Sequence, residues 1–226
     1  MIKFQNVTKT YNFHTTVLDN VSFTIKKGEF VSIVGKSGAG KTTLIKLLLG
    51  IEKPTSGEIF FDNNNVGEMT SGQLQKLRRR IGVAYQDYKL LPKKTVYENI
   101  SYVMAVKGKS DQEIEKEVTQ ILDITGLLGK EENFPEELSG GEQQRLAVAR
   151  AIACQPEVIV ADEPTGNLDP YNSYEIIYIL QKLNKMGKTI ILASHDKDIT
   201  NKLGKRVITL EDGAVIRDEE KGRFMI

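Results

Sequence analysis

The chain has 226 residues, of which 40% are hydrophobic, so it can bury a core in one large domain or two small lobes. Its 31 lysines and arginines balance 30 aspartates and glutamates, and a formal charge of +1 gives no electrostatic reason to expect nucleic acid as a partner. The sequence contains no run of about eighteen apolar residues, so we expect no membrane-spanning helix, and the first residues lack the pattern of a secretory signal. Cys154 is the single cysteine, which excludes an internal disulfide. We therefore expect a cytosolic chain.

The first half of the chain reads mainly as strands. Alternating apolar residues at 2–7 and again at 21–25 predict two half-buried strands. A short apolar strand at 30–34 then runs into a glycine-rich loop, and a helix is predicted over 42–50. Another strand follows at 59–61.

The residue pattern changes in the second half of the chain, where roughly 87–155 reads as a helical lobe inserted between core strands. Charged residues crowd a helical pattern at 111–122, with apolar residues on one face. A strand at 158–161, a helix at 174–183 and a strand at 189–193 come next. Strands that alternate with helices predict an α/β fold, with a parallel sheet covered by helices on both faces.

The glycine-rich loop has the spacing G-x-x-x-x-G-K-[ST] of a phosphate-binding loop. Its residues are Gly35, Lys36, Ser37, Gly38, Ala39, Gly40, Lys41 and Thr42, followed by Thr43. The glycines let backbone N–H groups approach phosphates, and the helix that follows directs its positive end at the anion. We expect Lys41 to lie near the β- and γ-phosphates and the Thr42 hydroxyl to bind Mg²⁺. The loop therefore predicts a nucleoside triphosphate site.

Two acidic residues end the apolar strand at 158–161. Asp162 fits a residue that holds Mg²⁺, usually through water, and Glu163 stands one residue closer to the γ-phosphate. A carboxylate in that place can orient and polarise the attacking water. The acids alone also fit a solvated strand end, and the phosphate-binding loop favours the catalytic interpretation.

A second glycine motif follows about a hundred residues after the first. Its residues are Ser139, Gly140, Gly141, Glu142 and Gln143. Serine followed three residues later by glutamate has the pattern of a helix capping box, which offers a purely structural interpretation. That interpretation leaves the two glycines unexplained. Bare glycines at a helix start suit backbone contact with phosphate, so this motif can complete a site on another molecule.

The stretch 138–145, together with the other motifs in this order, resembles the ATP-binding cassette (ABC) ATPases along essentially the whole chain. The resemblance implies a P-loop NTPase with a RecA-like parallel-sheet core, an N-terminal antiparallel β-subdomain and an inserted helical subdomain, all in one ATP-binding domain over 1–226. It also implies ATP and Mg²⁺ as ligands. Two copies would close head to tail on ATP, each holding one nucleotide between its own phosphate loop and the other copy's second glycine motif.

The resemblance also implies roles for single residues. Glu163 would be the catalytic base, His195 the residue that senses the γ-phosphate, and Gln86 a glutamine near Mg²⁺ and the attacking water. Asp169 would belong to the loop that links the two active sites. Tyr11 would stack on adenine with Val17 beside it, and plain packing of Tyr11 is the alternative.

Within the family, the closest resemblance is to cell-division ATPases, carried by the stretches 77–82, 95–100 and 217–222. It implies a separate permease-like membrane partner that contacts the chain near Asp87 to Pro92, and hence a peripheral place on the cytoplasmic face of the membrane. Dimer closure would then activate cell-wall hydrolases through that partner. The ATPases of lipoprotein-release or macrolide-export transporters share the run 161–169 and stay an alternative.

Two other classes of protein stay open from the sequence. A soluble ABC protein of translation or DNA repair usually carries two cassettes or a long coiled-coil insertion, which this chain has no room for. A phosphotransferase would use the phosphate loop but leaves the motif at 138–145 without a role.

Overall fold

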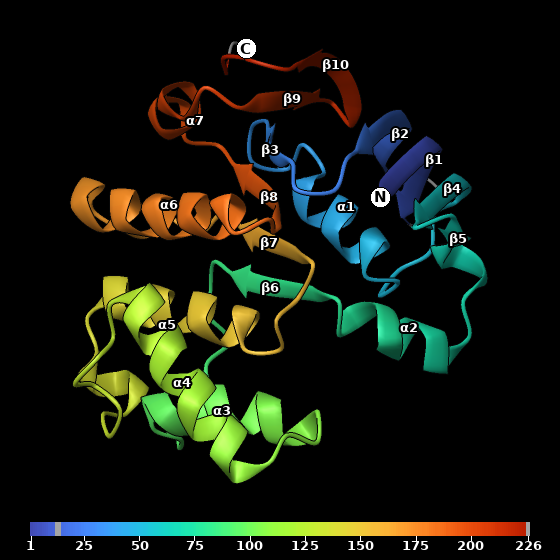
Figure 1. The fold of residues 1–226 in the computed structure, drawn as a ribbon. Coiled ribbons are helices and arrows are strands. Elements are labelled where there is room, and N and C mark those ends of the chain that lie inside the picture. Colours follow the sequence, from blue (N-terminus) through green and yellow to red (C-terminus); the bar gives the residue numbers. More distant parts are fainter. Residues whose placement is uncertain (12–14, 225–226) are drawn as a thin grey trace.

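The computed structural model describes residues 1–11 and 15–224, and their strands form two sheets (Figure 1). The first sheet is antiparallel, with the strand order β2-β1-β4-β5. Its strands are β1 (Ile2–Tyr11), β2 (Thr15–Ile25), β4 (Ser56–Phe61) and β5 (Asn64–Asn65). Buried and exposed residues alternate along β1 and β2 because only one face of this sheet lies against the core.

The second sheet is the core sheet, with the strand order β10-β9-β3-β8-β7-β6. Its strands are β3 (Phe30–Val34), β6 (Ile81–Tyr85), β7 (Val158–Asp162), β8 (Thr189–Ser194), β9 (Arg206–Glu211) and β10 (Ala214–Glu219). All neighbouring pairs are parallel except β9 and β10. Every residue of β3, β7 and β8 is buried, as expected for parallel strands that are covered on both faces.

Alternation along the core strands decides which residues face which layer. Val158 and Val160 join the cluster formed with α1 (Lys41–Leu48) and the first sheet. Ile159 and Ala161 point the other way, into the cluster formed with the helices after β6. The core sheet is therefore packed on both faces, with the first sheet and α1 on one side.

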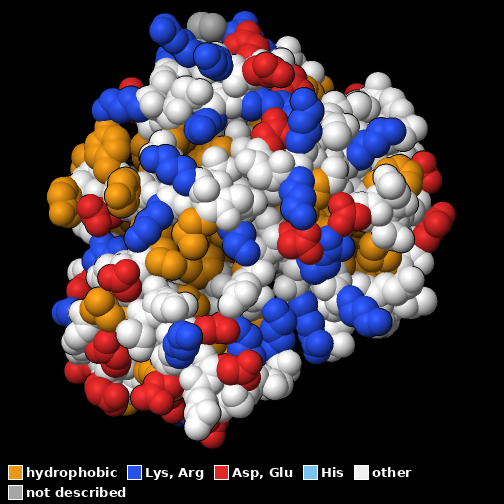
Figure 2. Space-filling view, in the orientation of Figure 1, with side chains coloured by type: hydrophobic (Ala, Val, Ile, Leu, Met, Phe, Trp, Pro, Cys, Tyr) orange, Lys and Arg blue, Asp and Glu red, His pale blue; other side chains and the backbone are white. Residues whose placement is uncertain are grey.

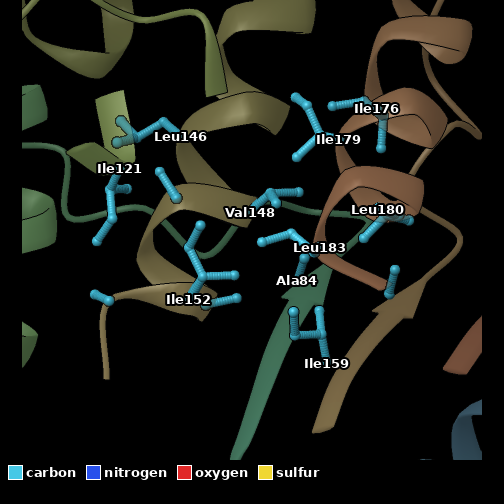
Figure 3. Packing of buried hydrophobic residues seen from close by; sticks show 14 of the residues in the cluster. Ala84, Ile121, Leu146, Val148, Ile152, Ile159, Ile176, Ile179, Leu180 and Leu183 are labelled. Carbon is cyan, nitrogen blue, oxygen red and sulfur yellow. The ribbon is translucent and has the colours of Figure 1, made fainter. Parts of the chain in front are cut away.

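The helices of the second layer lie on the opposite face of the core sheet and in the lower lobe of Figure 1. They are α3 (Val96–Val106), α4 (Asp111–Thr125), α5 (Gly140–Ile152), α6 (Pro170–Lys185) and α7 (Lys197–Leu203). Figure 3 shows Val148 of α5 near Leu183 of α6 and the strand residue Ala84, while Leu146 of the same helix lies toward Ile121 of α4. Through α5 the lower lobe shares one hydrophobic core with the sheet.

The fold class predicted from the sequence is confirmed, while several elements differ in their bounds. The helix predicted at 174–183 begins earlier, at Pro170, because Asp169 caps it and proline is accepted in the first turn. The helix predicted at 42–50 is α1 and ends at Leu48. No prediction covered β6, β9, β10 or the helices α2 (Ser71–Arg78) and α7, and α3 fell inside the predicted helical lobe without bounds of its own.

The C-terminal end of the described chain packs against the core sheet. Phe224 is buried against Val34 and Val207, and its N–H donates to Asn201 of α7, so its side chain packs on the strand residue that directly precedes the phosphate loop. None of the described helices is long and apolar enough to cross a membrane.

Candidate active site

Three neighbouring strand ends bring the predicted catalytic residues together. The phosphate loop follows β3, Glu163 follows β7 and His195 follows β8, and these parallel strands are adjacent in the sheet. Their ends line a cavity of about 450 Å³ whose walls are Val17, Ser37, Gly38, Gly40, Lys41, Thr42, Thr43, Gln86, Glu163 and His195. A crevice at the carboxyl ends of parallel strands is the usual place for a ligand in such a fold.

The Lys41 ammonium group lies at the centre of the site and is almost fully buried. It donates to the carbonyl oxygens of Gly35 and Lys36, at 2.8 and 3.1 Å. Its third partner is the Glu163 carboxylate, with Nζ 3.1 Å from Oε1 and side-chain exposures of 5% for Lys41 and 13% for Glu163. The charge that would meet a phosphate is therefore neutralised inside the chain.

Glu163 connects this lysine to His195. Its second carboxylate oxygen lies 2.7 Å from His195 Nδ1 and accepts the His195 backbone N–H at 3.2 Å. An ionised carboxylate only accepts, so the Nδ1 atom carries the hydrogen in this pair. Glu163 has a φ of 50°, a left-handed conformation that is uncommon for a side chain of this size. The Ala193 carbonyl accepts its N–H at 2.9 Å and helps to hold that turn.

Asp162 and Thr42 form the oxygen-rich part of the site. The Thr42 hydroxyl donates to Asp162 Oδ2 at 3.1 Å. Burial raises the pKa of the Asp162 carboxyl, and the nearby Glu163 charge acts in the same direction, while the Thr42 hydroxyl opposes both. Gln86 is exposed, lines the same cavity, and lies close to Gly166, where a Cβ would come within 3.0 Å of Gln86 Nε2.

Two glycines of the phosphate loop are required by close packing. A Cβ on Gly35 would lie 2.4 Å from the Leu210 carbonyl oxygen. Gly40 has a φ of 102°, and its Cβ would lie 2.9 Å from the Val17 carbonyl oxygen. The loop is thus pressed against β2 and β9, and only glycine fits at these two places.

Tyr11 and Val17 have different surroundings. Val17 lines the cavity and also a neighbouring one of about 410 Å³ that includes Lys36, Ala39 and the turn at 211–213. Among the described residues that line these cavities, Tyr11 is absent. Its hydroxyl hydrogen-bonds to Glu52, and the Lys9 ammonium lies 4.8 Å from its ring centre. The role of Tyr11 in stacking stays a prediction.

The second glycine motif begins α5 with the capping box that its sequence indicates. The Ser139 hydroxyl oxygen accepts the Glu142 N–H at 3.3 Å, and the Glu142 carboxylate accepts the Ser139 N–H at 2.8 Å. Gln143 donates from its side chain to the carbonyls of Pro135 and Leu138. Within the described chain, the N–H groups of Gly140 and Gly141 have no acceptor.

The two glycines of this motif differ, which the sequence did not reveal. A Cβ on Gly141 would lie 1.9 Å from Asn172 Oδ1, so packing inside one chain accounts for this glycine. A Cβ on Gly140 would find its nearest neighbours at 3.6 and 3.8 Å, which is ordinary contact. Only Gly140 therefore lacks a structural reason within the chain. Among the described lining residues of the cavity, none comes from 139–143.

Asp169 lies beside this motif. It caps α6 by accepting the Asn172 N–H at 3.1 Å, and the Asn172 side chain accepts from Arg145 at 3.3 Å. Asn172 is a connecting residue that sequence reasoning missed. Its place three residues after a capping aspartate was the available signal, but nothing in the sequence showed that it meets α5.

The segment from Asp87 to Pro92 is where the resemblance implies a contact with a membrane partner, and its large side chains are partly covered by the chain itself. Tyr88, Leu90 and Leu91 are all half-buried, and Leu90 packs against the core that α5 shares. Tyr88 and Lys89 have positive φ values of 57° and 51°, and the Tyr88 carbonyl accepts from Arg150 at 3.0 Å. Arg150 was not predicted as a functional residue, since its contact spans 62 residues of sequence.

Comparisons with known proteins agree with this geometry. The family model described as "ABC transporter" matches residues 18–166. The cell division ATP-binding protein FtsE of Bacillus subtilis strain 168 is 45% identical over 224 residues, which cover 99% of this chain and 98% of the relative. The protein of the same name from Streptococcus pneumoniae strain D39 is 49% identical over 99% of this chain and 97% of its own.

Solved structures of the same kind superpose on the chain. The dimeric post-hydrolysis state of the ATP-binding cassette MJ0796, bound to ADP and Pi, has a TM-score of 0.89 and 39% identity and covers 99% of this chain and 100% of its own. CbiO1 from Clostridium perfringens, part of an ABC transporter complex, has a TM-score of 0.90 and 35% identity over 97% of this chain and 88% of its own. The chain therefore belongs to the ABC transporter family and is one of its ATPase cassettes.

Proposed function

We propose that the chain works as the ATPase subunit of an FtsEX-type cell-division complex. ATP binds with its phosphates over the loop from Gly35 to Thr43, and Lys41 exchanges the Glu163 carboxylate for the β- and γ-phosphates. The observation that carries this proposal is the network in which the nearly buried Glu163 carboxylate joins the buried Lys41 to the exposed His195. It supplies a cation, a carboxylate and an imidazole to one cavity, as hydrolysis of a triphosphate requires.

The residues beside this network suit Mg²⁺. Thr42 and Asp162 offer a hydroxyl and a carboxylate oxygen 3.1 Å apart, and Gln86 adds an amide oxygen to the same cavity. Oxygen donors of this kind are what Mg²⁺ prefers. When bound there, the ion would neutralise phosphate charge. Thr42→Ser should preserve the Mg²⁺ dependence of ATP hydrolysis, and Thr42→Val should weaken Mg²⁺-dependent ATP binding with little change in the ion-free state.

Hydrolysis follows from the position of Glu163. A water molecule between Glu163 and the γ-phosphate gives a proton to the Glu163 carboxylate. At the same time the oxygen of this water attacks the γ-phosphorus, and the bond between that phosphorus and the oxygen that leaves with ADP breaks. His195 holds the carboxylate through Nδ1 and directs its other ring nitrogen toward the γ-phosphate. Proton transfer by a positioned base contributes typically 10²- to 10⁴-fold to rate.

A second copy completes the site. The free N–H groups of Gly140 and Gly141 at the start of α5 form an anion receptor, and they do not line the cavity of their own chain. Both cassettes described as dimeric among the solved neighbours support a homodimer. We take its arrangement to be head to tail, since that brings the start of α5 to the other chain's phosphate loop. ATP would bind between one chain's phosphate loop and the other chain's Ser139, Gly140 and Gly141.

The membrane partner in this proposal is FtsX, which would hold the chain at the cytoplasmic face of the membrane. The likeness to FtsE proteins along nearly the whole chain supports it. Dimer closure would be transmitted through FtsX to activate peptidoglycan hydrolases outside the membrane. The contact would lie near Asp87 to Pro92, since this segment follows Gln86 of the active site and leads to the start of α3.

Co-purification from detergent-solubilised membranes tests the whole proposal. We expect an FtsX-like membrane protein to elute with the tagged chain. A lipoprotein-release or macrolide-export permease in its place would keep the ATPase mechanism and replace the biological role. Elution without any membrane protein would contradict the proposal.

A further inference from the structure

The first turn of α6 lies against the start of α5, and Asn172 makes the contact. Hydrophobic side chains gather on the outer side of α6 in Figure 2, and the exposed residues of this helix include Tyr171 and Tyr174. Asn172 lies between them in the sequence but is half-buried, because it turns toward the neighbouring helix. A Cβ on Gly141 would stand 1.9 Å from its Oδ1 atom and 2.3 Å from its Cγ atom, so the amide is pressed against the bare Cα of that glycine.

The amide of Asn172 joins two groups of opposite charge. Its oxygen accepts from the Arg145 guanidinium at 3.3 Å, and its nitrogen donates to the Asp169 carboxylate at 2.5 Å. Only this orientation of the amide satisfies both partners, because a guanidinium only donates and a carboxylate only accepts. The hydrogen bonds from Asn172 hold the pKa of Asp169 below its ordinary value. An aliphatic side chain at this position could serve neither partner.

Arg145 depends on this amide. It stands four residues after Gly141, so both lie on the face of α5 that meets α6. Its Nε atom is buried and has no hydrogen-bond partner in the described chain, which leaves the bond to Asn172 as the contact that holds the guanidinium. Without the amide, a half-buried charge would lose its acceptor and the first turns of α5 would lose a tether.

The loop before α6 follows the same turn of α5. The point where a Cβ on Gly140 would stand lies 3.8 Å from Leu168, and Gly166 lies close to Gln86 of the cavity. The loop itself begins at Glu163. The stretch from Glu163 to the first turn of α6 therefore connects a chain's own cavity with the glycine N–H groups that would serve the other chain's nucleotide.

We propose that Asn172 is a positioning residue for the ATP held by the other chain's phosphate loop. This inference rests on the homodimer of the proposed function and adds a residue that shapes its second half-site. By filling the space beside Gly141 and joining Arg145 to Asp169, the amide fixes the direction of the N–H groups of Gly140 and Gly141. Hydrogen bonds weaken steeply as their angle departs from linear, so a first turn that can tilt holds the γ-phosphate less well.

Dimerisation on ATP provides the first test. It would be measured by analytical ultracentrifugation in the Glu163→Gln chain, in which slow hydrolysis lets an ATP-bound dimer accumulate. Adding Asn172→Ala should weaken ATP-dependent dimerisation at least about tenfold. The affinity of the single chain for ATP, measured at concentrations too low for dimers, should stay within about twofold. The backbone N–H of residue 172 still donates to Asp169 in this variant, and alanine favours a helix more than asparagine does, so α6 should stay folded.

Asn184→Ala is the matched control. Asn184 lies at the other end of α6, and its amide also joins segments of the chain, since it donates to the carbonyls of Gly28 and Lys188 at 2.9 Å. Its replacement should change the stability of the chain and leave ATP-dependent dimerisation within about twofold. Equal losses of dimerisation in Asn184→Ala and Asn172→Ala would show a general effect on the fold and would overturn the inference.

Asn172→Asp separates shape from hydrogen bonding. It keeps the shape that fits beside Gly141 and an oxygen for Arg145, and it replaces only the donor to Asp169, by a second carboxylate. Dimerisation should weaken at least about threefold. A dimer as tight as that of the Glu163→Gln chain alone would show that the bond to Asp169 has no part in the positioning.

The distribution of two substitutions between paired Glu163→Gln chains tests whether Asn172 acts across the interface. Lys41→Ala removes ATP from one phosphate loop, so each pair closes on a single nucleotide. That nucleotide meets an intact Asn172 of the other chain when Asn172→Ala and Lys41→Ala are on separate chains. It meets the replaced residue when both changes are on the same chain. The first pair should associate at least about fivefold more tightly, and equal or weaker association would overturn the inference.

The outcomes separate this inference from the proposed function. If the Glu163→Gln chain forms no dimer with ATP, the homodimer of the proposed function fails. If it dimerises and the addition of Asn172→Ala changes nothing, the positioning role is wrong while the proposed function stands. If Asn172→Ala instead weakens ATP binding to the single chain, Asn172 acts on its own cavity and the inference is overturned.

Discussion

Replacing Glu163 by glutamine gives the sharpest test of the active-site network. The change removes the negative charge 3.1 Å from the Lys41 ammonium and keeps an oxygen that can accept the His195 N–H. At an effective dielectric constant of about 20, two unit charges at that separation attract by about 5 kcal/mol. Desolvation cancels much of this attraction, so a net value of about 1–3 kcal/mol is expected for a hydrogen-bonded pair of this kind.

That free energy should be seen in two measurements. Without nucleotide, Glu163→Gln leaves Lys41 buried with only neutral acceptors, so the free energy of unfolding should fall by about 1–3 kcal/mol. With ATP, the phosphate no longer has to displace a carboxylate, so ATP should bind about 5- to 100-fold more tightly. Hydrolysis should nevertheless fall by about 10²- to 10⁴-fold, because the base is gone.

The assays are urea unfolding, equilibrium binding of ATP and phosphate release, each with Glu157→Gln as the matched control. Glu157 is also a carboxylate in an ion pair, with Arg80 at 2.6 Å, but it lies outside the cavity. Its replacement should change stability and leave ATP affinity within about twofold. Unchanged ATP affinity in a well-folded Glu163→Gln chain would refute the competition between carboxylate and phosphate, and an undiminished ATPase rate would refute the assigned base.

Three further changes test other parts of the structure. Gly141→Ala should lower the free energy of unfolding by about 1–3 kcal/mol because the new Cβ meets Asn172. Gly140→Ala should leave the free energy of unfolding in urea unchanged or slightly higher and should reduce ATP hydrolysis. Equal effects of the two substitutions would contradict the conclusion that only Gly141 is required by packing within the chain. Phe224→Ala should cost about 2–4 kcal/mol in urea unfolding, and Phe224→Leu less than about 1.5, because the side chain is buried against Val34 and Val207. Hydrogen bonds from Ser139 hold the pKa of Glu142 below its ordinary value of 4.5, so this stabilising contribution is present at neutral pH and is lost as the pH falls through the lowered pKa. Glu142→Gln should therefore make the melting temperature less sensitive to acid, and an identical acid dependence in both chains would count against the capping box.

The sequence predicted best where one residue type is required by local geometry. The phosphate loop, the acids at the end of β7 and the capping box at Ser139 each have a short spacing with a physical cause, so their places in the fold could be predicted without a structure. The parallel sheet also followed from alternating strands and helices, whereas the order of β3, β8 and β7 in it is known only from the structure. Their common edge then explains why Lys41, Glu163 and His195 meet.

Contacts between distant segments were not predictable from the same patterns. Arg150 binds a carbonyl 62 residues away, and Asn172 meets α5 from the start of α6. No local period or propensity encodes such pairs, since they depend on how two lobes pack. The interpretation of Gly141 changed for the same reason: its neighbour Asn172 comes from another helix, so a glycine that looked functional also has a packing role.

The start of α5 has a consequence for how the protein tolerates mutation over time. The anion receptor that we propose there consists of the backbone N–H groups of Gly140 and Gly141, and every amino acid except proline supplies such a group. Random substitutions along the outer face of this helix therefore cannot delete the receptor; they can only block access to it or unwind the turn. We infer that neutral drift is restricted at Ser139, Gly140 and Gly141 and much freer on the exposed positions that follow.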